Sequence, residues 1–142
     1  MEFSNTVAIN RRTDAVFAYL SDFENIPAWN YAISQTRRVG TGPVGVGTRY
    51  TQTRTIPKPA EEDFEIITFT PPHHLAIRGV LGPFRADSSY QLTQDGETTI
   101  LTNAMILEAS GVMKVAASLA GSRVRTAVAA NLDVLKQLLE RR

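Results

Sequence analysis

The sequence predicts an α+β fold in which a curved, seven-stranded antiparallel sheet wraps around one long C-terminal helix. Three observations support this prediction. Runs with a period of two fill the chain from Ile33 to Ala109, connections rich in Gly and Pro separate them, and a proline-free helical pattern follows from about Val112 to Leu139. Because the 142 residues contain no internal repeat or linker, we expect a single domain, 1–142, with a substantial core.

The first thirty residues predict one strand and two short helices. Phe3–Ile9 alternates between apolar and polar residues, as a half-buried strand does. Thr13 and Asp14 are good N-cap residues for a short helix that continues through Ser21. Over Asp22–Trp29, the initial aspartate can cap a second, shorter helix.

Six further strands are expected between these helices and the C-terminal one. Each is an alternating run bounded by Gly or Pro, and together they form consecutive antiparallel strands. They span approximately Ser34–Gly40, Thr48–Ile56, Glu61–Thr70, His74–Gly79, Phe84–Gln94 and Glu97–Ala109. The closing helix carries small residues in its first half and leucines in its second, so it can pack tightly at one end and leave a hollow beneath the other.

A tight turn at Asp95-Gly96 predicts the register of the last two strands. Counting outward places Ser88 opposite Asn103, a polar pair on an otherwise apolar face. The other inward pairs are Leu92 with Thr99, Tyr90 with Leu101, Ala86 with Met105, and Phe84 with Leu107. Two interpretations stay open: Asn103 orients a carbonyl or hydroxyl of a bound ligand, or Asn103 and Ser88 satisfy each other or a buried water.

A second hairpin turns around the segment Pro57-Lys58-Pro59. This turn predicts that Arg54 lies opposite Glu62, near the loop at one end of the inner face. The pairs further from the loop are Gln52 with Phe64 and Tyr50 with Ile66. Arg54 and Glu62 are either polar anchors at a cavity mouth or an ordinary cross-strand ion pair, worth about 0–1 kcal/mol if exposed.

The composition excludes several classes of function. The net charge of +1 offers no footprint for nucleic acid or an anionic membrane surface. There is no cysteine, and His73 and His74 point in opposite directions on an extended chain, so we expect no metal site. The run Gly40–Gly45 matches G-x-G-x-x-G, but a strand follows it, so we expect a turn and no cofactor. Without a signal segment or an apolar run of ~18–20 residues, the chain is predicted to be cytoplasmic, with no integral membrane contact.

Five segments resemble one known superfamily. Thr13–Asp22 followed by Ile26–Trp29 resembles the opening helices of the START/Bet v 1-like (SRPBCC) superfamily, most closely its polyketide cyclase/dehydrase-like group. Gly45–Tyr50 and Pro71–Leu75 resemble two of its strand connections, and Leu132–Glu140 resembles its last helix. The resemblance covers nearly the whole chain and implies a helix-grip fold with a deep apolar cavity between sheet and helix.

The resemblance implies that a hydrophobic small molecule binds in this cavity, such as an aromatic polyketide, lipid, isoprenoid or quinone-like compound. In this fold the loops Ile56–Ala60 and Gly79–Pro83 flank the entrance, where the second is either a mobile flap or a plain tight connection. The expected ligand-binding residues face inward: Tyr50, Gln52, Arg54, Phe64, Ile66, Leu75, Ile77, Phe84, Ser88, Tyr90, Leu101, Asn103, Met105, Met113, Ala117 and Ala120.

Two other functions remain open. The first is a polyketide aromatase/cyclase-type enzyme, which needs a positioned acid or base; the inward-facing candidates are Tyr90, Arg54 and Glu62. The second is a protein-interaction or chaperone-regulator role. An outward apolar stripe of Ile100, Ala104 and Ile106 would suit that role or a homodimer contact.

Overall fold

The computed structural model describes residues 1–109 and 113–142, and within the C-terminal helix it describes side chains from Gly121 onward. All strands belong to one antiparallel sheet with the order β1-β7-β6-β5-β4-β3-β2, which confirms the predicted α+β, helix-grip fold. The elements are β1 (Glu2–Ile9), α1 (Thr13–Leu20), the 3-10 helix η1 (Phe23–Asn25), α2 (Ile26–Trp29), β2 (Ile33–Val39), β3 (Arg49–Arg54), β4 (Ala60–Thr70), β5 (His74–Leu81), β6 (Phe84–Asp95), β7 (Thr98–Glu108) and α3 (Met113–Glu140). The expected strands are all present, with ends that differ by one or two residues.

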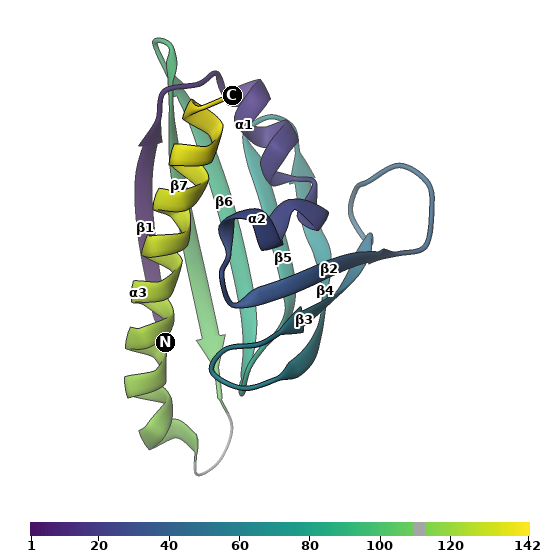
Figure 1. Ribbon diagram of the computed structural model, residues 1–142, viewed down its shortest axis with the longest axis vertical. Helices are drawn as coiled ribbons and strands as arrows, with labels where there is room; N and C mark the ends of the chain where they lie inside the picture. Colours follow the sequence, from purple (N-terminus) through teal and green to yellow (C-terminus); the bar gives the residue numbers. More distant parts are fainter. Residues whose placement is uncertain (110–112) are drawn as a thin grey trace.

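The helices cover one face of the sheet. Figure 1 shows α3 running along β1 and β7, with α1 and α2 beside it over the middle of the sheet. The short helix α2 contacts both α3 and β2, so it joins the long helix to the far edge of the sheet. Among the described residues, no helix is long and apolar enough to cross a membrane.

The main core lies where the C-terminal half of α3 meets the sheet and α1. Leu132, Leu135 and Leu139 are almost fully buried there, as their spacing on one helix face requires. Beside them Phe23 packs edge-on against Tyr50, with ring centroids 5.4 Å apart. Full burial of each such side chain contributes roughly 1.5–3 kcal/mol, so this end of the molecule is well stabilised.

The register of the β6–β7 hairpin differs from the predicted one by two residues. Asp95 pairs with Thr98, so the turn is Gly96-Glu97 rather than Asp95-Gly96. Gly96 takes the positive φ of 61° at the first central position, as in a type II′ turn. The observed inward pairs are Leu92 with Leu101, Tyr90 with Asn103, Ser88 with Met105, and Ala86 with Leu107. A shift of two keeps every side chain on its predicted face, because side chains alternate with a period of two.

The β3–β4 hairpin shifts in the same way. Arg54 pairs with Ala60, and Gln52 rather than Arg54 lies opposite Glu62. The remaining inward pair is Tyr50 with Phe64. The reason is that the five-residue loop is centred on Pro57 and not on Lys58. The predicted inward face is again preserved.

Neither Thr13 or Asp14 in α1 nor Asp22 in η1 makes the expected side-chain capping bond, although Asp22 does occupy the N-cap position. Arg12 occupies the N-cap position of α1, and no side chain caps it. The Thr13 backbone N–H instead donates to Gln94 Oε1 at 2.8 Å, so a side chain from β6 satisfies the first turn of α1. Asp22 stands at the N-cap of η1 without a side-chain hydrogen bond.

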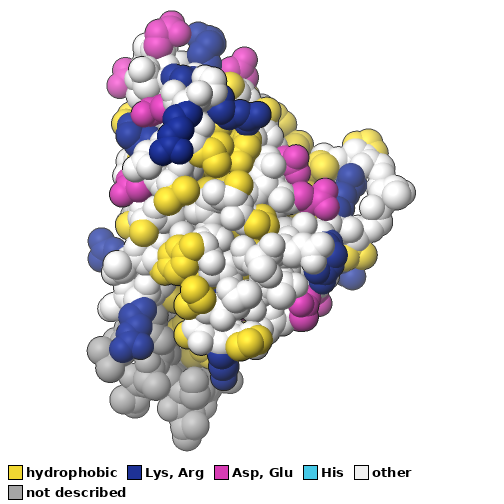
Figure 2. All heavy atoms as spheres, viewed as in Figure 1, with side chains coloured by type: hydrophobic (Ala, Val, Ile, Leu, Met, Phe, Trp, Pro, Cys, Tyr) yellow, Lys and Arg dark blue, Asp and Glu magenta, His cyan; other side chains and the backbone are white. Residues whose placement is uncertain are grey.

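The outward stripe on β7, formed by Ile100, Ala104 and Ile106, is only partly exposed. Ala104 is exposed, Ile106 is 42% exposed, and Ile100 is half-buried. On the opposite, helix-bearing face, apolar side chains of the described residues reach the surface in several separate patches (Figure 2). A homodimer contact at the β7 stripe stays a prediction.

Candidate functional site

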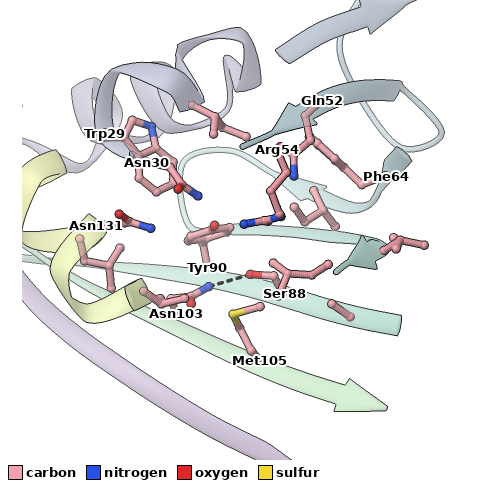
Figure 3. Close-up of a pocket in the computed structure, with 18 residues that line it drawn as sticks. Trp29, Asn30, Gln52, Arg54, Phe64, Ser88, Tyr90, Asn103, Met105 and Asn131 are labelled. Carbon is pink, nitrogen blue, oxygen red and sulfur yellow. Dashed lines mark hydrogen bonds between the residues drawn. The ribbon is translucent and has the colours of Figure 1, made fainter. Parts of the chain in front are cut away.

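A cavity of about 90 Å³ lies between the inner face of the sheet, α2 and α3 (Figure 3). Its wall is mostly apolar, with a few polar side chains among the aliphatic and aromatic ones. Its lining residues are Ile26, Trp29, Asn30, Gln52, Arg54, Phe64, Ile77, Gly79, Val80, Leu81, Ala86, Ser88, Tyr90, Asn103, Met105, Val128, Asn131 and Leu132. This mixture of apolar surface and sparse, buried polar groups is typical of small-molecule sites.

The structure brings together half of the residues expected from the sequence. Eight of them line the cavity: Gln52, Arg54, Phe64, Ile77, Ser88, Tyr90, Asn103 and Met105. Five face inward but are packed in the core instead: Tyr50, Ile66, Leu75, Phe84 and Leu101. Met113, Ala117 and Ala120 lie outside the side chains that the structure describes.

The core residues are excluded from the cavity because neighbouring elements cover them. Tyr50 is only 2% exposed, with its ring stacked 5.2 Å from Phe64 and against the edge of Phe23. Ile66 and Leu75 are fully buried in the same cluster, which also contains the leucines of α3. The space above these strands is therefore already filled.

The expected ligand-binding residues include none of the lining residues of α2 and of the second half of α3, and Gly79, Val80 and Leu81 are expected only as part of an entrance loop. Asn131 is the most informative of them, because it is a buried polar residue on the apolar face of α3. The spacing of Val128, Asn131, Leu132 and Leu135 is i, i+3, i+4, i+7, which is the signal that could have placed Asn131 inside.

One side of the cavity holds a fully bonded polar group, the Glu62 cluster, formed by Gln52, Arg54, Glu62 and Gly82. Arg54 donates to both carboxylate oxygens of Glu62, from Nε at 2.8 Å and from Nη2 at 3.0 Å. Gln52 Nε2 donates to Oε1 at 2.9 Å, and the Gly82 backbone N–H donates to Oε2 at 2.7 Å. The Arg54 and Glu62 side chains are only 10% and 1% exposed, so this is a buried bidentate pair and not the exposed one considered above.

The Gly82 backbone N–H connects the β5–β6 hairpin to the Glu62 cluster. The hairpin is a tight connection, because Leu81 pairs directly with Phe84 across Gly82-Pro83. A Cβ at Gly79 would clash with the Asp63 carbonyl oxygen, so only glycine allows the close approach of β5 to β4 here. Of the two alternatives, a mobile flap or a tight connection, the structure has the geometry of a tight connection. Whether this hairpin moves stays a prediction.

The other side of the cavity holds the Asn103 cluster, formed by Ser88, Asn103 and Asn131. Asn103 Nδ2 donates to Ser88 Oγ at 2.8 Å and to the Ser89 carbonyl oxygen at 3.1 Å. The two side chains are diagonal neighbours rather than a facing pair. Asn103 Oδ1 and Asn131 Oδ1 are both buried without a hydrogen-bond partner among the described residues. The Asn103 amide nitrogen is therefore bonded to Ser88, whereas its amide oxygen has no donor among the described residues.

Tyr90 lies between these clusters in Figure 3. Burial raises the pKa of its phenol, and the neighbouring Ser88 hydroxyl offsets part of this effect. The phenol is therefore protonated at neutral pH and can donate a hydrogen bond or a proton. Of the candidate catalytic side chains, Glu62 accepts four hydrogen bonds and Arg54 donates two of them, so Tyr90 is the candidate whose proton is not already used within the Glu62 cluster.

The histidines lie away from the cavity. His73 and His74 border a separate depression with residues of β6. In the described part of the chain, no three His, Cys, Asp or Glu side chains are grouped as metal ligands.

Comparisons with known proteins extend this description. A family model described as "Polyketide cyclase / dehydrase and lipid transport" matches residues 1–140. The structure is similar to TTHA0849 from Thermus thermophilus, with a TM-score of 0.82 and 15% identity over 98% of this chain and 97% of that one. A search of curated proteins by sequence found no match.

Two further similar structures carry aromatase/cyclase names. The Zhui aromatase/cyclase from Streptomyces sp. R1128 has a TM-score of 0.82 and 16% identity over 100% of this chain and 94% of that one. The di-domain ARO/CYC StfQ from the steffimycin biosynthetic pathway has a TM-score of 0.83 and 13% identity over 99% of this chain and 50% of that one. At these identities the similarity shows a shared fold.

Proposed function

The chain belongs to the polyketide cyclase/dehydrase and lipid transport family, and we propose that it binds a hydrophobic small molecule in the cavity between sheet and α3. The observation that supports this proposal is the cavity itself, with its apolar wall and its two buried oxygens that have no partner among the described residues. Apolar wall atoms that lack packing partners and buried oxygens that lack a donor both lower the stability of a fold. Binding of a ligand that packs against the wall and donates a hydrogen bond is therefore favoured. The expected ligand classes remain aromatic polyketides, lipids, isoprenoids and quinone-like compounds.

The size of the cavity limits how much of a ligand fits without movement of the protein. Its volume of about 90 Å³ is smaller than the roughly 300–1,000 Å³ of pockets that take drug-sized molecules. A single small ring or a short chain is therefore the part that fits here. Larger members of these classes require the lining side chains to move.

The test is thermal unfolding in the presence of a panel drawn from the four ligand classes. A ligand at about 100 times its Kd adds about 2.7 kcal/mol, or roughly 5–10 °C for a chain of this length. Ala86→Leu places extra atoms in the cavity and is expected to abolish the shift. Ala104→Leu is the matched control, because Ala104 is exposed on the outer face of the sheet. A panel without any shift, or equal shifts in Ala86→Leu and the wild type, contradicts the proposal.

A second candidate is a polyketide aromatase/cyclase activity in the same cavity. It is favoured by the names of the similar structures and by the buried, protonated Tyr90 on the cavity wall. In the dehydration that follows an aldol closure, the phenol would protonate the leaving hydroxyl as the C–O bond breaks, and the resulting phenolate would take the α-proton as the C=C bond forms, so that water is released and the phenol is restored. Arg54 would orient a carbonyl oxygen of the substrate. Turnover of a poly-β-ketone substrate by the wild type and its loss in Tyr90→Phe would support this activity. Binding without turnover would leave the protein as a binding module.

A further inference from the structure

Two carboxamide oxygens on the cavity wall have no hydrogen-bond partner among the described residues. Asn103 on β7 is 1% exposed and Asn131 on α3 is 5% exposed, and Oδ1 of each is buried. Figure 3 shows both side chains at the same end of the cavity, one from the sheet and one from the helix. Buried polar groups in native proteins are nearly always hydrogen-bonded, so two exceptions in one small space require an explanation.

The orientation of the Asn103 amide is fixed by its surroundings. Its Nδ2 lies 3.1 Å from the carbonyl oxygen of Ser89, which can only accept a hydrogen bond. Turning the amide over would place Oδ1 against this carbonyl oxygen, whereas the Ser88 hydroxyl can donate or accept and does not distinguish the two orientations. The group that Asn103 leaves free is therefore an acceptor, and its partner must be a donor.

The need for a hydrogen-bond donor separates ligands that carry a hydroxyl group from ligands whose oxygens can only accept. A ketone, quinone, ester or ether presents only oxygen lone pairs, so it would give Asn103 Oδ1 no hydrogen-bond donor. A hydroxyl group donates its hydrogen and still accepts through its oxygen. The buried, protonated phenol of Tyr90 on the same wall is a suitable donor to that oxygen.

The surroundings of the two asparagines select an apolar body for the ligand. Ile77, Met105, Val128 and Leu132 contribute aliphatic or thioether surface to the same cavity. We propose that the cavity takes an apolar ring or chain that bears an alcohol or phenol hydroxyl, which donates to Asn103 Oδ1 and lies beside Asn131. This inference rests on the proposed function and specifies which chemistry the site selects.

The test compares molecules that share a carbon skeleton and differ only in the oxygen. Cyclohexanol with cyclohexanone, and 1-indanol with 1-indanone, form two such pairs of graded size, and indane supplies the skeleton alone. Dissociation constants are measured by NMR titration of the full chain, which detects weak binding. We expect each alcohol to bind roughly 10- to 100-fold more tightly than its ketone. Asn103→Leu should reduce this preference to about twofold or less.

The variants keep the inference testable if Asn103→Leu does not fold. Asn131→Leu removes the second acceptor without disturbing the bonds to Ser88 and Ser89, and it should weaken the same preference. Asn10→Leu, at an exposed asparagine, is the matched control and should keep the wild-type preference.

The outcomes separate this inference from the proposed function. Alcohol, ketone and indane binding with equal affinity, or tighter binding of the ketone, overturns the inference and leaves the cavity as a general apolar site. A hydroxyl preference that survives in both asparagine variants also overturns it. If none of these molecules binds and the panel of the four ligand classes gives no thermal shift, both proposals are overturned.

Discussion

The two polar clusters on the cavity wall differ in whether their hydrogen bonds are complete. In the Glu62 cluster, one buried carboxylate accepts four hydrogen bonds from Gln52, Arg54 and Gly82. In the Asn103 cluster, two buried oxygens have no partner in the part of the chain that the structure describes. Because each unpartnered buried group costs about 1–3 kcal/mol, folding alone accounts for the first cluster but not for the second.

The comparison separates two uses of buried polar residues in one cavity. The Glu62 cluster connects β3, β4 and the β5–β6 hairpin, so its role is to hold the cavity wall in place. The Asn103 cluster connects β7 to β6 through one amide nitrogen and leaves the oxygen free. Removing a residue from the first cluster should therefore harm folding, whereas removing one from the second should harm binding.

The largest expected effect is the loss of stability in Glu62→Gln. The substitution leaves the Arg54 guanidinium, whose side chain is only 10% exposed, without its anion. Removal of one partner of a buried ion pair typically costs about 3–5 kcal/mol. Urea unfolding of the variant and the wild type at neutral pH measures this difference.

A neighbouring glutamate provides the control for Glu62→Gln. Glu61 bonds Arg37 at 3.0 Å on the outer face of the sheet, where the two side chains are 58% and 42% exposed. Water screens this pair, so Glu61→Gln should cause a far smaller loss of stability. Equal losses in the two variants would mean that the Glu62 cluster is not the structural support described above.

The second prediction is a gain of stability, in Asn131→Leu. Asn131→Leu removes a buried oxygen that no described residue bonds, and it adds apolar surface to the face of α3 that meets the sheet. We expect the free energy of unfolding to rise by about 1 kcal/mol, since the cost of the unsatisfied group disappears. Urea unfolding without ligand checks this value. A loss of stability would show that the oxygen has a partner in the folded protein, which would also weaken the ligand proposals.

The same contrast explains how much the sequence could predict. Strand faces are predicted correctly even though both hairpin registers are off by two residues, because an even shift leaves Asn103 and Glu62 on the inner face. A turn displaced by one residue is enough to cause that shift, and propensity does not resolve it at Asp95 or Lys58. Which inward residues meet a cavity depends on how the helices cover the sheet, so Tyr50 could not be told apart from Tyr90.

Polar residues are the harder part of the site to predict from sequence. The carboxylate of Glu62 could be placed inside, but its bond to the Gly82 backbone N–H depends on a hairpin that is distant in sequence. Side-chain size along α3 distinguishes its small first half from its leucine-rich second half, but it does not single out Asn131, whose signal is a polar residue on the buried face. Local sequence patterns therefore predict which strand residues face the cavity better than they predict the hydrogen bonds between residues that are distant in sequence.

The smallest expected effect concerns an Arg–carboxylate pair of the same geometry on the outer face of the sheet. Arg78 donates to Asp87 from Nε at 2.9 Å and from Nη2 at 3.0 Å, as Arg54 does to Glu62, but the two side chains are 51% and 37% exposed. The hydrogen bonds from Arg78 lower the pKa of Asp87 below its ordinary value of 3.8, although partial burial opposes this shift. Asp87→Asn should therefore cost less than about 1 kcal/mol at neutral pH, because water screens the pair.

The pH dependence of this small effect tests its origin. Because the pKa of Asp87 is lower in the folded than in the unfolded chain, the pair stabilises the protein fully only above 3.8, and this contribution is lost as the pH falls through the lower, folded value. Urea unfolding of the wild type and Asp87→Asn between pH 7 and pH 2 should therefore give curves that converge only at the acidic end. A constant difference would mean that packing, and not charge, separates the two proteins. A loss as large as that of Glu62→Gln would mean that burial is not what distinguishes the two pairs, and the comparison between the clusters would lose its physical basis.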